Sequence, residues 1–198
     1  ACLRFGVNRF HQVSTDEVYG DLPLESTSAF TEESALHPSS PYAASKASAD
    51  LLVLSYARTY GLPITISRCS NNYGRFQHRE KLIPKVIDCA CRDISIPVYG
   101  RGDNRRDWIH VDDHCTAIDY VLHKGKENHT YNVSAHEEIN NLELIRKILA
   151  ILGKSDDLIT FVNDRPGHDR RYAMDTSRLE KLGWKAKRNL DDFLNTLK

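Results

Sequence analysis

The sequence predicts an α/β fold in which a partial parallel sheet is followed by a smaller C-terminal lobe. Short strand-like runs alternate with segments of helical periodicity along the 198 residues, a pattern typical of strand–helix–strand units. After about residue 70 the loops become rich in Arg, His, Asn and Pro, which indicates a lobe that offers polar side chains to a ligand. We therefore divide the chain into residues 1–70 and 71–198, and expect the last sheet elements to be interleaved with the second part.

The first part contains a long helix between two strands. Residues 10–14 form the first strand, and a polar loop follows it. Ser40 then provides an N-cap and Pro41 the first helical position, and the apolar period of this helix ends at Gly61, a residue that favours a helix C-terminus. Residues 63–69 have the composition of a buried strand.

The second part continues the alternation of helices and strands. Its expected elements are a helix over residues 82–92, a strand over 96–99, a helix capped by Asp112 and running to about His123, a strand over 130–133, a helix over 142–152 closed by Gly153, a strand over 159–162, and two short helices opened by Asp175 and Asn189.

Composition excludes several classes of partner. Lys plus Arg and Asp plus Glu both total 27, so no overall field favours nucleic acid or an anionic membrane. No apolar stretch approaches the roughly 20 residues that span a bilayer, and no signal-peptide pattern is present. The five cysteines form no CxxC pair, which argues against a disulfide framework and against a metal site. We expect a cytoplasmic protein without a metal.

A Tyr and a Lys lie four residues apart near the start of the long helix. This spacing places the side chains of Tyr42 and Lys46 on one face, about one turn apart. A nearby ammonium stabilises a phenolate, so the Tyr, whose ordinary pKa is about 10, could act as a base. Taken alone, the two residues could equally form an ordinary surface pair.

Two adjacent carboxylates follow the first strand. Thr15, Asp16 and Glu17 come directly after it, and ligands gather at the ends of strands in open α/β sheets. Alone, this stretch could be a solvated turn with Asp as a cap. Together with Tyr42 and Lys46 it resembles the active site of the extended short-chain dehydrogenase/reductase family, and the Thr-Asp-Glu version is similar to that of its nucleotide-sugar 4,6-dehydratases.

The resemblance extends along the whole chain and points to the dTDP-glucose 4,6-dehydratases within the NAD-dependent epimerase/dehydratase group. The matching motifs, in order, are SRCSNNYG (67–74), EKLIP (80–84), PVYG (97–100), RDW (106–108), YNV (131–133) and DRPGHDRRY (164–172). Arg75 departs from the family, in which a Pro often follows Asn-Tyr-Gly. Gly167 and His168 favour a thymidine nucleotide, because UDP-glucose 4,6-dehydratases typically have other residues there.

The resemblance implies a Rossmann-type sheet that binds NAD. Residues 1–70 would be the C-terminal part of the NAD-binding domain, and residues 71–198 mainly a nucleotide-sugar-binding lobe. No G-x-G-x-x-G precedes Thr15, so we expect the first strands and the Gly-rich turn to be missing and the 198-residue chain alone to be inactive. The resemblance also implies a homodimer for the full-length protein, and the apolar residues Leu51, Leu54 and Ala57 of the long helix agree with this.

The resemblance also implies a role for each site residue. Tyr42, Lys46 and Asn72 would bind the cofactor. The substrate-binding residues would be Thr15, Asn71, Lys81, Leu82, Pro97, Val98, Tyr99, Arg106, Asn141, Asp164, Arg165, Pro166, Gly167 and His168. Physical chemistry agrees for the two arginines, whose planar forks suit phosphate oxygens.

The implied reaction converts dTDP-glucose to dTDP-4-keto-6-deoxyglucose, with NAD reduced and reoxidised in one turnover. Tyr42 would deprotonate the carbon-4 hydroxyl with help from Lys46 and Thr15. Glu17 would then remove the carbon-5 proton while protonated Asp16 assists loss of the carbon-6 hydroxyl. The alternatives are a UDP-glucose 4,6-dehydratase, another nucleotide-sugar dehydratase or epimerase, or a non-catalytic fragment that only binds nucleotide sugar.

Overall fold

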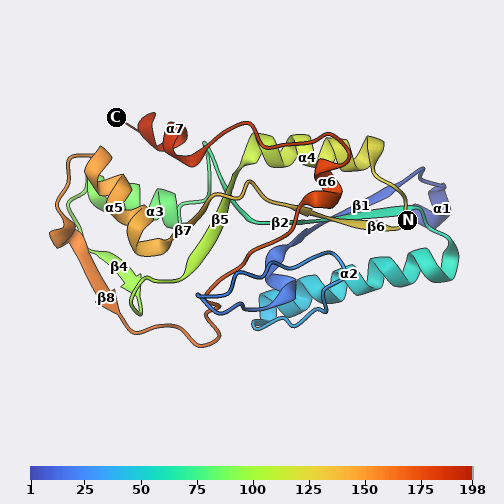
Figure 1. Cartoon of the computed structure of the whole chain (residues 1–198), viewed down its shortest axis with the longest axis horizontal. Helices are drawn as coiled ribbons and strands as arrows, with labels where there is room; N and C mark the ends of the chain where they lie inside the picture. Colours follow the sequence, from blue (N-terminus) through green and yellow to red (C-terminus); the bar gives the residue numbers. More distant parts are fainter. Residues whose placement is uncertain (198) are drawn as a thin grey trace.

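The computed structural model describes residues 1–197 and is shown in Figure 1. Its elements, in chain order, are α1 (Cys2–Phe5), β1 (Phe10–Thr15), the 3₁₀ helix η1 (Asp16–Tyr19), α2 (Pro41–Tyr60), β2 (Ile64–Cys69), β3 (Asn71–Tyr73), α3 (Leu82–Cys91), β4 (Ile96–Tyr99), β5 (Arg105–His110), α4 (Val111–Lys124), β6 (His129–Val133), β7 (Glu138–Asn140), α5 (Asn141–Ile151), the 3₁₀ helix η2 (Asp156–Leu158), β8 (Ile159–Val162), α6 (Ser177–Glu180) and α7 (Leu190–Asn195).

The predicted α/β class and parallel sheet are confirmed. Strands β1, β2 and β6 pair in that order, all parallel, with Phe10 opposite Ile64 and Thr65 opposite His129. Helices α2 and α4 cover opposite faces of this sheet (Figure 1). Because parallel strands end at the same edge, the chain that leaves β1 and β2 enters the same region of the molecule.

Helix α2 begins and ends as the sequence predicts. Ser40 is the N-cap, and its hydroxyl accepts a hydrogen bond from the backbone N–H of Ala43 at 3.1 Å. Pro41 occupies the first turn, where a missing N–H costs nothing. Gly61 ends the helix with φ of 65°, a left-handed conformation that glycine adopts without strain. These local signals fix the position of the helix that carries Tyr42.

Helices α3 and α5 and two small sheets form a second group of elements, here called the second lobe. Strand β4 pairs in parallel with β8, while β5 pairs in parallel with β3 and antiparallel with β7. The inner faces of α3 and α5 meet in one core with β4 and α7. The fully buried residues of this core include Val86, Ala90, Leu144, Ile148, Leu149 and Leu194.

Three strands of this lobe were not predicted. β3 and β7 have only three residues each, too few for a periodic pattern. β5 buries two charged residues, Arg106 at 8% exposure and Asp107 at 5%, so its sequence lacks the alternation of apolar and polar residues by which strands are recognised. Buried polar groups in an irregular strand are typical of a functional region.

Two predicted helix starts are wrong. The N-cap of α4 is His110 and not Asp112, because the His110 Nδ1 atom accepts a hydrogen bond from the Asp112 N–H at 3.1 Å. Asp175 does not open α6 directly: Thr176 is the N-cap, while the Asp175 carboxylate accepts from the Ser177 N–H at 2.7 Å. Asn189, in contrast, caps α7 as predicted.

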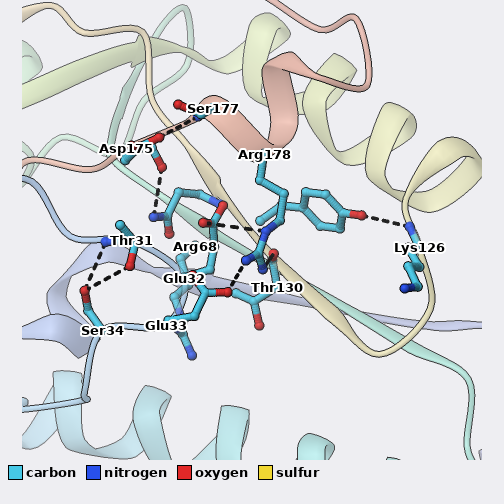
Figure 2. A network of polar contacts seen from close by, with 12 residues as sticks. Thr31, Glu32, Glu33, Ser34, Arg68, Lys126, Thr130, Asp175, Ser177 and Arg178 are labelled. Carbon is cyan, nitrogen blue, oxygen red and sulfur yellow. Dashed lines mark hydrogen bonds and ion pairs between the residues drawn. The ribbon is translucent and has the colours of Figure 1, made fainter.

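The long loop between η1 and α2 is anchored by charged side chains. The backbone N–H of Asn132 in β6 donates to Glu32 Oε1 at 3.0 Å. Figure 2 shows Arg178 between Glu32, Glu33 and Thr130; its guanidinium pairs with Glu33 and donates to the Thr130 carbonyl at 3.0 Å. The loop is thereby fixed against both the central sheet and α6.

The structure also bears on membrane and metal binding. Within residues 1–197, no helix combines the length and apolar character needed to cross a bilayer. The same residues contain no group of three or more His, Cys, Asp or Glu side chains arranged to hold a metal ion.

Candidate active site

A cavity of about 870 Å³ is lined by residues from both parts of the chain, 1–70 and 71–198. Glu17 and Tyr42 line it from the side of the central sheet. Of the predicted substrate residues, those that line the cavity are Asn71, Lys81, Leu82, Pro97, Val98, Tyr99, Arg106, Asn141, Arg165, Pro166, Gly167 and His168. Residues 150 positions apart in the sequence are therefore brought to one site, although two of the predicted substrate residues, Thr15 and Asp164, do not line it.

The acid pair lies where β1 runs into η1. Asp16 is 3% exposed, and its Oδ1 atom accepts a hydrogen bond from the Thr15 hydroxyl at 3.2 Å. Its Oδ2 atom is buried without a partner among the described residues. Burial, followed by the charge of Glu17, raises the pKa of Asp16 to about 8. For a buried carboxyl with an unpaired oxygen, the protonated form costs less free energy than the charged form.

Glu17 differs from Asp16 because it reaches the cavity. Its pKa is also raised, mainly by burial, but the positive charges of Arg106, Lys81 and Arg165 oppose this effect. Two adjacent carboxyls thus have different environments, and the proton is held preferentially by Asp16. Such a difference is what an acid and a base in one site require.

Tyr42 is 55% exposed at the first turn of α2. Burial of part of its ring and the charge of Glu17 raise its pKa above the ordinary value. Lys46, one turn later, donates from Nζ to the Val13 carbonyl of β1 at 2.8 Å. The side chains share a helix face as predicted, but in the chain alone Lys46 does not convert Tyr42 into a base.

Arg106 lines the cavity, and hydrogen bonds to backbone carbonyls hold its side chain in place. Its Nη1 atom donates to the Arg105 carbonyl at 2.8 Å, and Nη2 donates to the Asp169 carbonyl at 2.7 Å. Its Cζ atom lies 4.5 Å from the ring centroid of Tyr172. These contacts fix the guanidinium, whose positive charge opposes the rise in the pKa values of Asp16 and Glu17.

The segment of residues 164–172, here called the substrate wall, carries the other arginine. Arg165 Cζ lies 5.5 Å from the ring centroid of Tyr99, and His168 meets the same ring edge-on. Asp164 lies outside the cavity but accepts from His168 Nδ1 at 2.6 Å and from the Arg165 N–H at 2.9 Å. Asp164 therefore orients the residues beside it.

Asn72, predicted to touch the cofactor, lies outside the cavity lining. Its Nδ2 atom donates to the Ser70 carbonyl at 3.1 Å, and its Oδ1 atom is 2.9 Å from His114 Nδ1. Burial lowers the pKa of His114 to about 4, so this ring is neutral and can donate from Nδ1. The side chain of Asn72 is thus already bonded within the protein.

Several cavity residues were missed by sequence reasoning. Trp108, Asp169 and Tyr172 line the cavity, and all three belong to motifs that the sequence displays, so their motif membership was the available signal. Gln77 and Ile145 also line it, but no local pattern distinguishes them from ordinary loop and helix residues.

The sequence of this chain is similar to those of known proteins. Residues 1–197 match the sequence profile of the GDP-mannose 4,6 dehydratase family. The dTDP-glucose 4,6-dehydratase of Escherichia coli is 48% identical over 192 residues, which cover 89% of this chain and 53% of the relative. A low-salt glycan biosynthesis protein of Haloferax volcanii is 48% identical over 194 residues, with 98% of this chain and 62% of the relative covered.

Solved structures agree with the sequence comparison. A dTDP-glucose 4,6-dehydratase from Streptomyces venezuelae, crystallised with NAD and TYD, has 43% identity and a TM-score of 0.95, covering 98% of this chain and 60% of that one. A UDP-glucose 4-epimerase from Thermotoga maritima has 26% identity and a TM-score of 0.89, covering 98% and 63%. The chain thus spans about half to two thirds of the length of such relatives, and by its match over residues 1–197 it belongs to the GDP-mannose 4,6 dehydratase family.

Proposed function

We propose that the full-length protein is an NAD-dependent nucleotide-sugar 4,6-dehydratase that converts dTDP-glucose to dTDP-4-keto-6-deoxyglucose. The observation that carries this proposal is the acid pair: Glu17 lines the same cavity as Tyr42, and its neighbour Asp16 has a pKa raised to about 8. Elimination of water requires a base and an acid at adjacent atoms of the sugar. Epimerisation at carbon 4 needs neither, so the pair favours dehydration.

The start of α2, which lies beside β1, fits a nicotinamide cofactor. Tyr42 is exposed and Lys46 lies on the same helix face, at the carboxyl ends of the parallel strands where dinucleotides bind in such sheets. When bound, NAD supplies the hydride acceptor and donor, and its positive ring would oppose the effects that raise the pKa of Tyr42. Lys46 then contributes a second positive charge and a donor for the cofactor ribose. The resemblance implies a cofactor contact for Asn72 as well.

The chain's own groups account for the proton transfers. Tyr42 accepts the proton of the carbon-4 hydroxyl as that carbon is oxidised to a ketone, with Thr15 as a hydrogen-bonding partner. The ketone acidifies the carbon-5 proton, which Glu17 removes. The resemblance implies that Asp16, which does not line the cavity in the chain alone, delivers its proton to the carbon-6 hydroxyl, which leaves as water. The raised pKa of Asp16 favours the protonated form that this step requires, whereas Tyr42, whose pKa is raised in the chain alone, would need the positive charges of Lys46 and of the bound cofactor to act as a base.

The substrate wall and α3 would hold the nucleotide. Arg106, Arg165 and Lys81 carry the positive charge that a diphosphate requires, while Pro97, Val98 and Tyr99 of β4 offer an apolar strip for the base. The other substrate residues proposed are Asn71, Leu82, Asn141, Asp164, Pro166, Gly167 and His168. A thymine base is preferred because of Gly167 and His168, and a uridine nucleotide remains the competitor to be tested.

We also propose that the full-length protein is a cytoplasmic homodimer. Leu51, Leu52, Tyr56 and Tyr60 of α2 are between 45% and 62% exposed, which leaves an apolar surface that a second copy could cover. Leu54 and Ala57 contribute less than the sequence suggested, because both pack against β2. Sedimentation at micromolar concentration should give a dimer.

Incubation of the natural full-length protein with dTDP-glucose, without added NAD, tests the activity. Mass spectrometry should show a sugar nucleotide that has lost one water. A product of unchanged mass with inverted carbon 4 would indicate an epimerase. Turnover of UDP-glucose in preference to dTDP-glucose would contradict the thymidine assignment. Binding of dTDP without any product would identify a non-catalytic nucleotide-sugar-binding protein.

A further inference from the structure

The substrate wall is joined to the start of the catalytic helix by one carboxylate. Asp169 is 6% exposed, and its Oδ2 atom accepts a hydrogen bond from the Ser39 hydroxyl at 2.6 Å and one from the Tyr172 hydroxyl at 2.5 Å. Ser39 and Asp169 are 130 positions apart in the sequence. We propose that Asp169 is a positioning residue that couples the substrate wall to the first turn of α2, and therefore to Tyr42.

The Asp169 side of this connection is rigid. Its backbone carbonyl accepts from Arg106 Nη2 at 2.7 Å and from Asn104 Nδ2 at 3.1 Å. Arg106 in turn lies against the Tyr172 ring, which is 5% exposed. Charge-assisted bonds in buried surroundings are stronger and more directional than those in water. The carboxylate is therefore held from its own backbone and from Tyr172 at once.

A second contact reaches the same point of the chain. Gly167 has φ of +68°, and a Cβ atom at this position would lie 3.2 Å from the Ser39 carbonyl oxygen. Only glycine accepts this backbone conformation and this close approach without strain. The substrate wall thus meets Ser39 twice, once through Asp169 and once through Gly167.

The Ser39 side is equally stiff. Ser40 is the N-cap of α2, and Pro41 fixes the next backbone φ angle. Tyr42 follows directly, so only two residues with constrained backbones separate it from Ser39. A displacement of Ser39 is transmitted to the Tyr42 ring, and a shift of about 1 Å at a reacting group can slow a reaction about 100-fold.

Asp169 has an electrostatic effect at the same site. Its negative charge is among the causes that raise the pKa of Glu17, after burial. The carboxylate thus contacts the substrate wall, the start of α2 and, through its field, the acid pair. This inference rests on the proposed function for its kinetic readout, but the geometric connection can be measured without turnover.

Ser39→Ala in the natural full-length protein is the first test, because it removes a single hydroxyl. The rate of nicotinamide reduction in a single turnover should fall about 10-fold, with the KM for dTDP-glucose changed less than threefold. Ser39→Thr keeps a hydroxyl and should recover most of the rate. Ser55→Ala is the matched control: Ser55 lies on α2, and its hydroxyl donates to the Leu52 carbonyl at 2.7 Å.

Asp169→Ala and its combination with Ser39→Ala test the shared bond. Because the amide of Asp169→Asn can still accept from Ser39, Asp169→Ala is the change that breaks the connection, and Asp169→Ala combined with Ser39→Ala should be no slower than Asp169→Ala alone. Asp169→Asn should move the acidic limb of the elimination rate to lower pH, since Glu17 loses a neighbouring negative charge. Tyr172→Phe provides a second variant if Asp169→Ala does not fold. Rates that multiply in the double variant, or no rescue by Ser39→Thr, would overturn the proposal.

A readout independent of activity separates this proposal from the function. The ring signal of Tyr42 in protein labelled with ¹³C-tyrosine, assigned with Tyr42→Phe, should shift in Ser39→Ala and remain in place in Ser55→Ala. This shift in a protein that does not dehydrate the sugar would support the connection and refute the function. If the Tyr42 signal does not shift in Ser39→Ala although the native enzyme dehydrates the sugar, the function would be supported and the connection refuted.

Discussion

Two carboxylates beside the cavity, neither of which lines it, show how differently the two neighbouring regions are built. Asp16 is 3% exposed, and burial raises its pKa to about 8. Asp164 lies on the substrate wall, where a hydrogen bond from His168 lowers its pKa. The pKa of the first carboxylate is set by desolvation, which salt does not screen, whereas the second carboxylate is itself 44% exposed and its pKa is set by a hydrogen bond from the nearly buried His168. Under the proposed function, the region around Asp16 and Glu17, here called the catalytic end, would supply the chemistry, and the substrate wall would supply binding that salt can adjust.

The substitution expected to have the largest effect is Glu17→Gln at the catalytic end. Loss of a general base typically costs about 10²–10⁴-fold in rate, so dehydration should fall by this factor while nicotinamide reduction by substrate persists. Single-turnover absorbance and product mass separate the two steps. Glu127→Gln, on an exposed residue paired with Arg9, should leave both steps unchanged. Equal loss of both steps in Glu17→Gln would contradict the division of roles.

Arg106 connects the two regions, and Arg106→Lys should weaken both. A lysine cannot bond the Arg105 and Asp169 carbonyls from a planar fork. Leaving such buried acceptors unpaired should lower the free energy of unfolding by about 2–4 kcal/mol. Urea titration measures this change, and calorimetry should show weaker dTDP binding. Arg101→Lys is the matched control, because Arg101 pairs with Asp103 on the surface. Unchanged stability in Arg106→Lys would mean that the backbone contacts contribute little.

The pH dependence of stability tests the catalytic end alone. Between about pH 4 and pH 8 the folded chain keeps a proton on Asp16 that the unfolded chain releases, so stability falls as the pH rises through this interval. Each pH unit corresponds to about 1.4 kcal/mol, so the loss from pH 5 to pH 7 is about 1–3 kcal/mol. Asp16→Asn should remove this dependence of the free energy of unfolding on pH. Asp103→Asn, on the surface, is the control and should leave it unchanged. A slope that persists in Asp16→Asn would place the proton elsewhere.

The difference between the two regions also explains how much the sequence could predict. Tyr42 and Lys46 are placed by local signals, the cap at Ser40 and the stop at Gly61, which need no tertiary contact to be recognised. The position of Asp16 and Glu17 can likewise be predicted locally, because they come directly after the strand β1. The connection between Ser39 and Asp169 joins positions that only the tertiary fold brings together.

Strand β5 illustrates a second limit on prediction. Its buried Arg106 and Asp107 are stabilised by partners from other elements, so the sequence has the polarity of a loop where the structure has a strand. Long-range contacts of this kind override local pattern. Trp108, also on β5, lines the cavity and belongs to the RDW motif, so its place at the site was missed although the sequence offered a signal for it.

The smallest effect is expected for Asp164→Asn on the substrate wall. An amide can still accept from the Arg165 N–H, but it cannot hold a protonated or polarised His168 as a carboxylate does. Exposed charged pairs contribute little, so dTDP affinity should fall only about two- to fivefold, with the rate of nicotinamide reduction unchanged. Because Asp164 is exposed, raising the salt concentration from 50 to 500 mM should shrink the difference in dTDP affinity between Asp164→Asn and the native protein. Any change in dTDP affinity that Asp16→Asn causes should be the same at both salt concentrations. Calorimetry with dTDP at the two salt concentrations measures this contrast. A loss of affinity for Asp164→Asn that is large and independent of salt would mean that the substrate wall is as preorganised as the catalytic end, and that the two regions do not differ in the way their carboxylates indicate.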